Sequence, residues 1–369
     1  MARRYGFALI GCGAVGAHHI TAIAQLRNAR LIAVCDTIEA SARRCGERAG
    51  VPWYTDYQTM LERDDVDIVN VCTPSGLHME PALAVMAAGK HCVVEKPLEI
   101  ALDRCDAMIA AADRAGVLLG AIFPSRFGAA AQELKRAVDA GRFGRLALGD
   151  AYVRWWREQS YYDSGGWRGT WKLDGGGALI NQSVHCVDLI QWYMGPAKAV
   201  AALSGCLAHE RIEVDDANVV AVEWACGALG VIQGTTAAWP GFPKKIAISG
   251  DAGSAVLEEE SLTFWQFRKG SARDARVRAG LVGDKAHGTG ASDPMAFSPE
   301  NHRRQLADFV RALETGARPL VDGREGRKAV EIILAAYKSA ETGRRVELPL
   351  DTRYKPGNEV VEGRVTRDA

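Results

Sequence analysis

The sequence predicts an α/β protein of two domains, in which a parallel sheet covered by helices is followed by a larger, mainly antiparallel sheet. The chain has 369 residues, which is too long for one ordinary hydrophobic core. Short apolar runs alternate with helix-like segments up to about residue 125, and longer strand-like runs follow. We therefore expect one domain over residues 1–125 and a second over 126–369, closed by helices within about 302–342.

Composition excludes several classes of partner. Lys plus Arg and Asp plus Glu each number 45, so no net charge attracts nucleic acid or an anionic membrane. No apolar run approaches the roughly 18 residues that span a bilayer. Nine scattered cysteines form no C-x-x-C pair, which favours a reducing cytoplasm, and with the histidines they show no metal-ligand spacing. We therefore expect a cytoplasmic protein without a metal.

The N-terminal run before Cys12 resembles a secretory signal, but it lies at the lower limit for a signal core. Cleavage there would also destroy a glycine motif.

In "FALIGCGAVGAHHI" an apolar strand leads into G-x-G-x-x-G and then into a helical segment, 14–26. The first glycine permits a tight turn, the second lets backbone approach a pyrophosphate, and the third allows close helix packing. The residues expected to line a dinucleotide here are Gly11, Gly13, Ala14, Val15 and Gly16.

The second strand, "LIAVCD", ends in an acidic residue that selects between cofactors. Asp36 lies about twenty residues beyond Gly16, the spacing of a carboxylate that binds a ribose 2′-hydroxyl. Thr37 and Ile38 follow it, and a carboxylate without a basic neighbour repels a 2′-phosphate. Arg43 and Arg44 are expected on a solvated helix face. The sequence therefore predicts a Rossmann domain that binds NAD and not NADP.

The alternation continues with strands at 66–72, 91–95 and 117–123 and helices at 79–89 and 101–115. Ligands of open parallel sheets bind at the carboxyl ends of the strands. Residues that follow strand ends there include Thr73, Pro74, His78, Glu95 and Lys96. We expect the first four to contribute to the cofactor site.

The second half combines long strand-like runs with a few helices. Helices are expected at 129–140, 181–193, 302–315 and 324–342, with a charged surface loop at 268–293. The run "VVAVEWACGALGVIQG", 219–234, has few charges on either face of a strand pair. An antiparallel sheet with two apolar faces needs a partner. We therefore predict a homo-oligomer, a tetramer in preference to a dimer.

The stretch "GGGALINQSVHCVDL", 175–189, carries a polar row. Asn181, His185 and Asp188 are spaced by four and three residues, which places them on one side of a helix. A lone His is more often buried and structural than catalytic. Cys186 points about 100° away from His185, which argues against a Cys–His nucleophile. His302 opens a helix, a position that is more often structural.

These motifs, in this order, resemble the Gfo/Idh/MocA family of sugar and cyclitol dehydrogenases. The resemblance rests on the fingerprint, on "EKP" at 95–97, on "GGGALINQSVHCVDLIQW" at 175–192 and on the closing 301–340. It implies a Rossmann domain followed by an α/β domain with an open-faced sheet. It places the family's catalytic Lys on Lys96 and its catalytic His on His185. Many members carry Asp where this chain has Asn181, and Asn cannot act as a base.

The resemblance implies an NAD-dependent dehydrogenase that oxidises a secondary ring hydroxyl of a sugar, glycoside, cyclitol or nucleotide-linked sugar. In this hypothesis His185 accepts the hydroxyl proton and Lys96 stabilises developing alkoxide character. Asn181 fixes a neighbouring hydroxyl. Asp188 either orients the imidazole or is a helix-face carboxylate. Residues 160–192 also resemble nucleotide-linked uronic acid 3-dehydrogenases.

The stretch "RWWREQSYYDSGGWRGTW", 154–171, gathers aromatic rings and arginines before the polar row. It suits a sugar-binding loop, with Arg168 and Trp171 as substrate contacts, or equally an oligomer interface. Two rival functions remain: tightly bound NAD used for redox-assisted glycoside cleavage or isomerisation, and a non-catalytic NAD-binding sensor.

Overall fold

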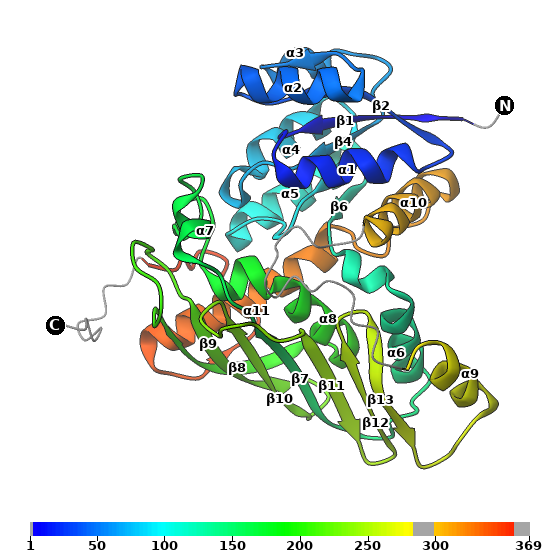
Figure 1. Cartoon of the computed structure of the whole chain (residues 1–369), viewed down its shortest axis with the longest axis vertical. Coiled ribbons are helices and arrows are strands. Elements are labelled where there is room, and N and C mark those ends of the chain that lie inside the picture. Colours follow the sequence, from blue (N-terminus) through cyan, green and yellow to red (C-terminus); the bar gives the residue numbers. More distant parts are fainter. Residues whose placement is uncertain (1–2, 283–298, 358–369) are drawn as a thin grey trace.

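The computed structural model describes residues 3–282 and 299–357 and contains two sheets, one in each half of the chain (Figure 1). The first sheet has six parallel strands in the order β3-β2-β1-β4-β5-β6. Its strands are β1 Tyr5–Ile10, β2 Ala29–Cys35, β3 Trp53–Tyr54, β4 Ile68–Val71, β5 His91–Val94 and β6 Leu119–Ala121. Strand β1 is buried along its whole length, as expected for a central parallel strand of continuous apolar sequence.

The helices between these strands make the crossovers that parallel pairing requires. They are α1 Ala14–Ala24, α2 Glu39–Ala49, α3 Tyr57–Leu61, α4 Met79–Ala87 and α5 Leu102–Ala115, with 3-10 turns η1 Ser75–Leu77 and η2 Pro124–Phe127. Strand order reverses beside β1, which pairs with β2 on one side and β4 on the other. The carboxyl ends of β1 and β4 therefore open a crevice, the usual ligand position in such sheets.

The second sheet has eight strands in the order β13-β12-β11-β7-β10-β9-β8-β14. Of its strand pairs only β7 with β10 is parallel. The strands are β7 Leu146–Arg154, β8 Ala197–Gly205, β9 Ala217–Trp224, β10 Leu229–Thr235, β11 Lys245–Gly250, β12 Gly253–Glu258, β13 Ser261–Phe267 and β14 Val346–Glu347. The predicted mainly antiparallel sheet is confirmed.

The helices of the second half differ from the predicted set in two places. They are α6 Ala129–Asp139, α7 Gln159–Asp163, α8 Val184–Met194, α9 Ala272–Gly280, α10 Glu300–Thr315 and α11 Gly323–Thr342. The predicted helix 181–193 is divided, because Ala178–Gln182 forms a π-helical turn (η3) before α8 begins. The predicted loop 268–293 contains helix α9, which Ser271 begins with a capping box; residues 283–298 lie outside the described residues.

Helix α10 packs against α1 (Figure 1). Leu306, Phe309 and Val310 share a hydrophobic cluster with Phe7 and Ile23 of the first sheet and α1. Helix α11 contacts α5 and β6 on one side and α8 and β8 on the other. The C-terminal helices therefore join the two sheets.

A buried ion pair holds α8 in place beneath the second sheet. Arg126 donates from Nε to Asp188 Oδ2 at 2.8 Å and from Nη2 to Oδ1 at 2.6 Å, and both side chains are fully buried. Glu325 of α11 accepts from Arg126 Nη1 at 3.0 Å. Burial raises the pKa of Asp188 and Arg126 opposes that rise. Arg126 donates to both Asp188 oxygens. The structure therefore favours the interpretation of Asp188 as a carboxylate on the face of α8 over a role in orienting the His185 imidazole.

The face of the second sheet opposite α8 and α11 carries exposed apolar side chains on five strands. Leu203 is 78% exposed, and the others are Leu148, Val219, Leu229 and Phe264. Strand register places Leu203 beside Val219 and Leu148 beside Leu229. Exposed apolar pairs of this kind on one face of a sheet are typical of an interface. Within the described ranges, no helix has the length and apolar character to cross a bilayer.

We predict that this apolar face forms the contact between subunits. Replacing Leu203 and Val219 together with Glu should raise the dissociation constant at least about tenfold, because carboxylates would be buried without partners. Light scattering at micromolar concentration should show the smaller species. Ala115→Glu on the exposed side of α5 is the matched control and should leave the mass unchanged. A monomeric wild-type protein would contradict the prediction.

Candidate active site

The turn between β1 and α1 has the geometry of a phosphate-binding loop. Gly11 has φ +100°, and a Cβ there would lie 2.4 Å from the Cys72 carbonyl oxygen. A Cβ on Gly16 would lie 2.5 Å from the Gly11 oxygen, so only glycine lets α1 pack this closely. A Cβ on Gly13 would meet nothing within 4 Å. Gly13 also begins α1 without a side-chain cap, so the first N–H groups of the helix, beginning at Ala14 and Val15, remain available to an anion.

Asp36 lies at the end of β2 and organises this loop. Its Oδ2 accepts from the Cys12 backbone N–H at 2.8 Å, and its Oδ1 accepts from Ile38 at 2.9 Å. The carboxylate is thus held beside the glycine turn, where the predicted ribose contact requires it.

Thr73, Pro74 and His78 form the loop after β4. Thr73 Oγ1 donates to the Leu77 carbonyl at 2.9 Å. The His78 ring nitrogens lie 2.9 Å from the carbonyl oxygens of Pro97 and Thr73, and the residue is 1% exposed. His78 therefore ties this loop to the segment after Lys96 and points its imidazole into the protein. Its expected contact with a cofactor stays a prediction.

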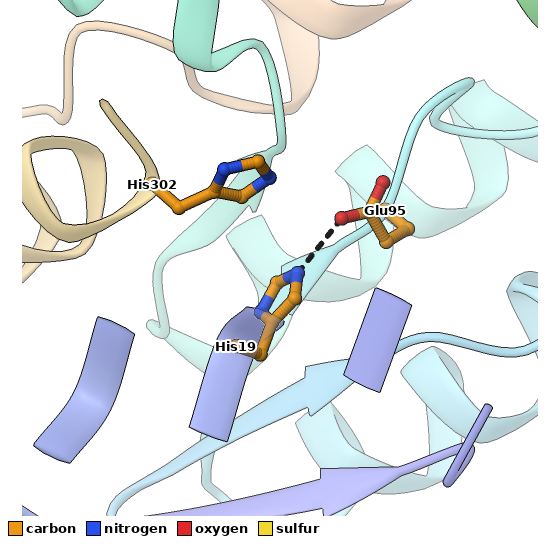
Figure 2. A group of neighbouring side chains, drawn as sticks. All are labelled: His19, Glu95 and His302. Atoms are coloured by element: carbon orange, nitrogen blue, oxygen red, sulfur yellow. Dashed lines mark hydrogen bonds and ion pairs between the residues drawn. The ribbon is translucent and has the colours of Figure 1, made fainter. Parts of the chain in front are cut away.

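The Glu95 side chain points toward His19 of α1 and lies near His302 of α10 (Figure 2). His19 Nε2 lies 2.7 Å from Glu95 Oε1, and the Lys96 backbone N–H donates to Oε2 at 3.0 Å. Burial alone would raise the pKa of Glu95, but the His19 contact and nearby positive groups hold it at about 2. Asn70 Nδ2 lies 2.7 Å from His19 Nδ1.

His302 of α10 completes this group, which sequence spacing did not reveal. Among the described residues, ligand atoms of His19, Glu95 and His302 lie within 4.8 Å of one another, close enough to share a metal ion. Burial lowers the pKa of His302 to about 4. The short contact between His19 and Glu95 already gives each of these two side chains a polar partner. The three residues therefore form a buried polar cluster that connects α1, β5 and α10.

Lys96 extends from the end of β5 toward the second domain. Its Nζ donates to the Asn181 backbone oxygen at 2.8 Å and to Asn181 Oδ1 at 3.1 Å. Burial lowers the pKa of Lys96, the Glu95 and Asp174 carboxylates counter that effect, and Arg168 and Arg157 add to it.

His185 lies in the first turn of α8 and is electrostatically coupled to Lys96. Burial and the positive charges of Lys96 and Lys244 lower its pKa well below the usual range. Its ring packs edge-on against Phe123, with centroids 5.8 Å apart. Its Nδ1 is buried without a hydrogen-bond partner among the described residues. The imidazole is thus neutral near pH 7 and has an unsatisfied polar atom, whereas burial raises the pKa of the adjacent Cys186 to about 12.

The glycine run before α8 is anchored by a buried carboxylate. Gly175 and Gly176 have φ of +81° and +146°, which L side chains rarely adopt. Asp215 Oδ1 accepts from the Gly177 N–H at 2.9 Å, and Oδ2 accepts from the Leu179 N–H at 3.0 Å. This sharp entry and the π-helical turn place Asn181 beside Lys96.

Two arginines of the aromatic-rich segment reach the same region. Arg168 and Arg157 place their guanidinium carbons 4.7 and 5.6 Å from the Tyr161 ring centroid. Arg157 Nη2 also lies 3.4 Å from Gln182 Oε1, and Arg168 Nη1 donates to the Ser164 carbonyl at 2.6 Å. Trp171 instead packs edge-on against Tyr337 of α11, so the structure does not group it with Lys96.

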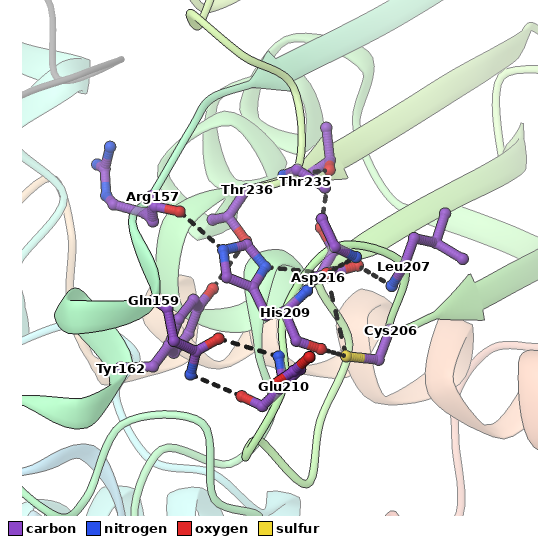
Figure 3. A network of polar contacts seen from close by, with 12 residues as sticks. Arg157, Gln159, Tyr162, Cys206, Leu207, His209, Glu210, Asp216, Thr235 and Thr236 are labelled. Atoms are coloured by element: carbon purple, nitrogen blue, oxygen red, sulfur yellow. Dashed lines mark hydrogen bonds and ion pairs between the residues drawn. The ribbon is translucent and has the colours of Figure 1, made fainter. Parts of the chain in front are cut away.

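A buried network fixes the loop that supports Arg157 (Figure 3). His209 contacts Asp216 Oδ2 through Nδ1 at 2.9 Å and the Arg157 carbonyl through Nε2 at 2.7 Å. Burial alone would lower the pKa of His209, but these two contacts leave it raised. Tyr162 and Thr236 join through their hydroxyls at 2.7 Å.

The structure brings together Lys96, Asn181 and His185, which the sequence had singled out, and adds Asp174 and Arg157, which it had not. Asp174 directly precedes the glycine run, and Arg157 lies within the aromatic-rich segment. Both residues therefore lie next to or within motifs that the sequence analysis had identified. A single Asp in a loop does not by itself predict a functional role.

Comparison with known proteins agrees with this geometry. Residues 5–123 match the model of the oxidoreductase family with an NAD-binding Rossmann fold, GFO_IDH_MocA, and residues 131–256 match the GFO/IDH/MocA C-terminal domain. The myo-inositol 2-dehydrogenase of Thermotoga maritima is 29% identical, over 92% of this chain and 97% of its own.

Two solved structures are more similar in sequence. The WlbA dehydrogenase of Chromobacterium violaceum is 37% identical, with a TM-score of 0.84 over 95% of this chain and 97% of its own. That of Bordetella pertussis is 34% identical, with a TM-score of 0.84 over 95% of this chain and 100% of its own. Both were solved in complex with NADH and UDP-GlcNAcA. The chain described here belongs to the GFO/IDH/MocA family of NAD-dependent oxidoreductases.

Proposed function

We propose that this protein is an NAD-dependent dehydrogenase that oxidises a secondary ring hydroxyl of a carbohydrate, and that Lys96 and His185 act on that hydroxyl. The observation that carries the proposal is the hydrogen bond from Lys96, beyond the carboxyl end of β5, to Asn181, together with the electrostatic coupling of Lys96 to His185 of α8. We further propose that the active form is a homo-oligomer in the cytoplasm, because an apolar sheet face is exposed and all nine cysteines are free.

The residues present fit the cofactor. The open space at Gly13, the uncapped start of α1 and the Asp36 carboxylate suit a pyrophosphate and a ribose diol. NAD, when bound, supplies the acceptor for the hydride that leaves the substrate carbon. The protein's own task is to hold the hydroxyl and remove its proton.

His185 suits proton removal because its lowered pKa leaves the imidazole neutral near pH 7. The same low pKa makes it a weak base, so the alkoxide character that develops on the oxygen needs stabilisation. The Lys96 ammonium can donate to that oxygen while it keeps its contact with Asn181. Asn181 has donor and acceptor atoms for a neighbouring hydroxyl.

The charges around the site favour a substrate with an anionic group. Arg157 and Arg168 both stack on Tyr161, and both lower the pKa of Lys96, so three cations converge there. Arginine forks bind carboxylates with two parallel hydrogen bonds. We therefore propose a uronic acid as the sugar, carried by a nucleotide, a choice that the ligand of the two WlbA structures supports.

A substrate panel tests this proposal. Cyclitols, aldoses, glycosides, UDP-GlcNAcA and UDP-GlcNAc should be offered with NAD and followed by NADH absorbance. We expect the highest kcat/KM with UDP-GlcNAcA, at least about tenfold above UDP-GlcNAc, which lacks the carboxylate. Equal use of this matched pair would contradict the anionic substrate, and absence of NADH with all members would contradict the dehydrogenase.

Cofactor preference should follow Asp36. Changing Asp36 to Ser and Thr37 to Arg should raise the affinity for NADPH relative to NADH at least about tenfold, since a repulsive charge is replaced by a phosphate partner. Fluorescence quenching measures both affinities without a substrate. Thr37→Ala is the control and should retain the preference for NADH. Equal binding of the two cofactors by the wild-type protein would show that this interpretation of the pocket is wrong.

Loss of Lys96 or His185 should reduce turnover and leave cofactor affinity unchanged. His185→Ala removes the base, which typically costs about 10²–10⁴ in rate. Lys96→Met removes the charge and should cost about 10²–10³. The double variant should be little worse than either single one, because both groups serve one transition state.

The measurement is kcat with saturating NAD, with NADH affinity by fluorescence quenching alongside. Cys186→Ala, next to His185 on α8, is the matched control and should retain turnover. Asn181→Asp restores the commoner family pattern and should retain activity. Near-wild-type kcat in His185→Ala would mean that the imidazole is structural.

A further inference from the structure

Asp174 is a buried carboxylate that contacts the site through Asn181. The residue is 1% exposed. Its Oδ1 accepts from Asn181 Nδ2 at 2.6 Å, and its Oδ2 accepts from the Gly169 backbone N–H at 3.0 Å. Asn181 Oδ1 in turn accepts from Lys96 Nζ at 3.1 Å. A continuous hydrogen-bonded chain therefore runs from Asp174 through Asn181 to Lys96.

The donor and acceptor properties of the chain allow only one orientation of the central amide. A Lys ammonium can only donate, and an ionised carboxylate can only accept. Asn181 must therefore turn Nδ2 to Asp174 and Oδ1 to Lys96. If residue 174 were an amide that kept its oxygen on Gly169, its NH₂ group would face Asn181 Nδ2. Asn181 would then have to turn over and present its own NH₂ group to Lys96.

We propose that Asp174 is the positioning residue for Lys96, and that its negative charge acts on Lys96 through Asn181. This inference rests on the proposed function in assigning Lys96 a role at the reacting oxygen. Asp174 contacts Asn181 and the Gly169 N–H, so its effect on Lys96 is indirect. It acts by orienting Asn181 and by keeping the Lys96 amine protonated.

The groups that face Asp174 come from several elements. Lys96 extends from the end of β5, Arg168 comes from the loop before Asp174, and Tyr161 and Tyr162 come from α7. Burial raises the pKa of Asp174 to about 7, although Gly169, Lys96, Asn181 and Arg168 act against the rise. The carboxyl therefore ionises near neutral pH, whereas the pKa of His185 lies well below its usual value. A neutral step, near pH 7, in the pH dependence of turnover is assigned to Asp174 only if Asp174→Asn removes it, because the pKa of His209 is also raised from its usual value.

Removal of this charge should change the chemistry of Lys96 directly. The Asp174 carboxylate favours the protonated amine, so Asp174→Asn should lower the pKa of Lys96. A fall of about one pKa unit means about tenfold more neutral amine at a fixed pH below that pKa. An amine-reactive reagent such as fluorodinitrobenzene, read by peptide mass spectrometry, should then label Lys96 about tenfold faster at pH 8.

Turnover gives a second readout. In the wild-type protein kcat should rise through about pH 7 as Asp174 ionises. In Asp174→Asn this step should vanish, and kcat at its optimum should fall about ten- to a hundredfold. Asp174→Asn combined with Asn181→Asp places a carboxylate directly on Lys96 and should restore both kcat and slow labelling. A merely structural residue would not be rescued in this way.

Glu213→Gln is the matched control. Glu213 accepts from the N–H of Trp171, three residues before Asp174, at 3.0 Å, and within the described part of the chain it makes no hydrogen bond with Asn181. It should leave the labelling rate and the neutral step unchanged. Unchanged Lys96 labelling in a folded Asp174→Asn protein would overturn the inference, as would the absence of rescue. If Asp174→Asn fails to fold, the labelling rate of Lys96 in the wild-type protein is measured as a function of pH. The inference requires a step in that rate near pH 7.

The labelling arm separates this inference from the proposed function. It uses the protein without substrate, so it gives a result even if no sugar is turned over. A wild-type protein that oxidises sugars while Asp174→Asn retains both the neutral step and slow labelling would leave the function intact and reject the role of Asp174.

Discussion

The contact between the Lys96 ammonium and Asn181 joins the two halves of the molecule, and the site depends on it. Lys96 lies two residues beyond the end of parallel strand β5, and Asn181 lies in a π-helical turn that follows three glycines. Both Asn181 oxygens accept from the ammonium, so neither domain can shift without the loss of a charge-assisted hydrogen bond. The position of His185 relative to the cofactor crevice follows from the same contact, because α8 begins directly after the turn.

Buried carboxylates keep that turn and helix in place. Asp215 satisfies the N–H groups of Gly177 and Leu179 at the entry, and Asp188 pairs with Arg126 farther along α8. Each buried charge would be costly without its partner. Asp174 accepts from the neutral Asn181 amide and from the Gly169 N–H, and it reaches Lys96 only through Asn181. Burial raises its pKa to about 7, because these contacts and the charges of Lys96 and Arg168 offset burial only in part.

The charges around the site bear on the proposed anionic substrate. Lys96, Arg157 and Arg168 are cations within one region, and Asp174 is the carboxylate that Lys96 reaches through Asn181. The His209–Asp216 pair holds the Arg157 backbone, and Tyr161 supports both guanidinium groups by stacking. These contacts restrict the arginines before any ligand arrives, which lowers the entropy lost when an anionic group binds.

Sequence alone determined the features that depend on local spacing. The glycine turn with Asp36 and the mainly antiparallel second sheet follow from short motifs and from periodicity, which report the backbone directly, whereas the candidate pair Lys96 and His185 came from the resemblance to the family. Tertiary structure decided what depends on contacts distant in sequence. It divided the expected helix at Ser183, paired Asp188 with Arg126, joined His19, Glu95 and His302, and placed Asp174 behind Asn181. A buried polar side chain acquires its role from the partner that folding brings to it, and no spacing along the chain encodes that partner.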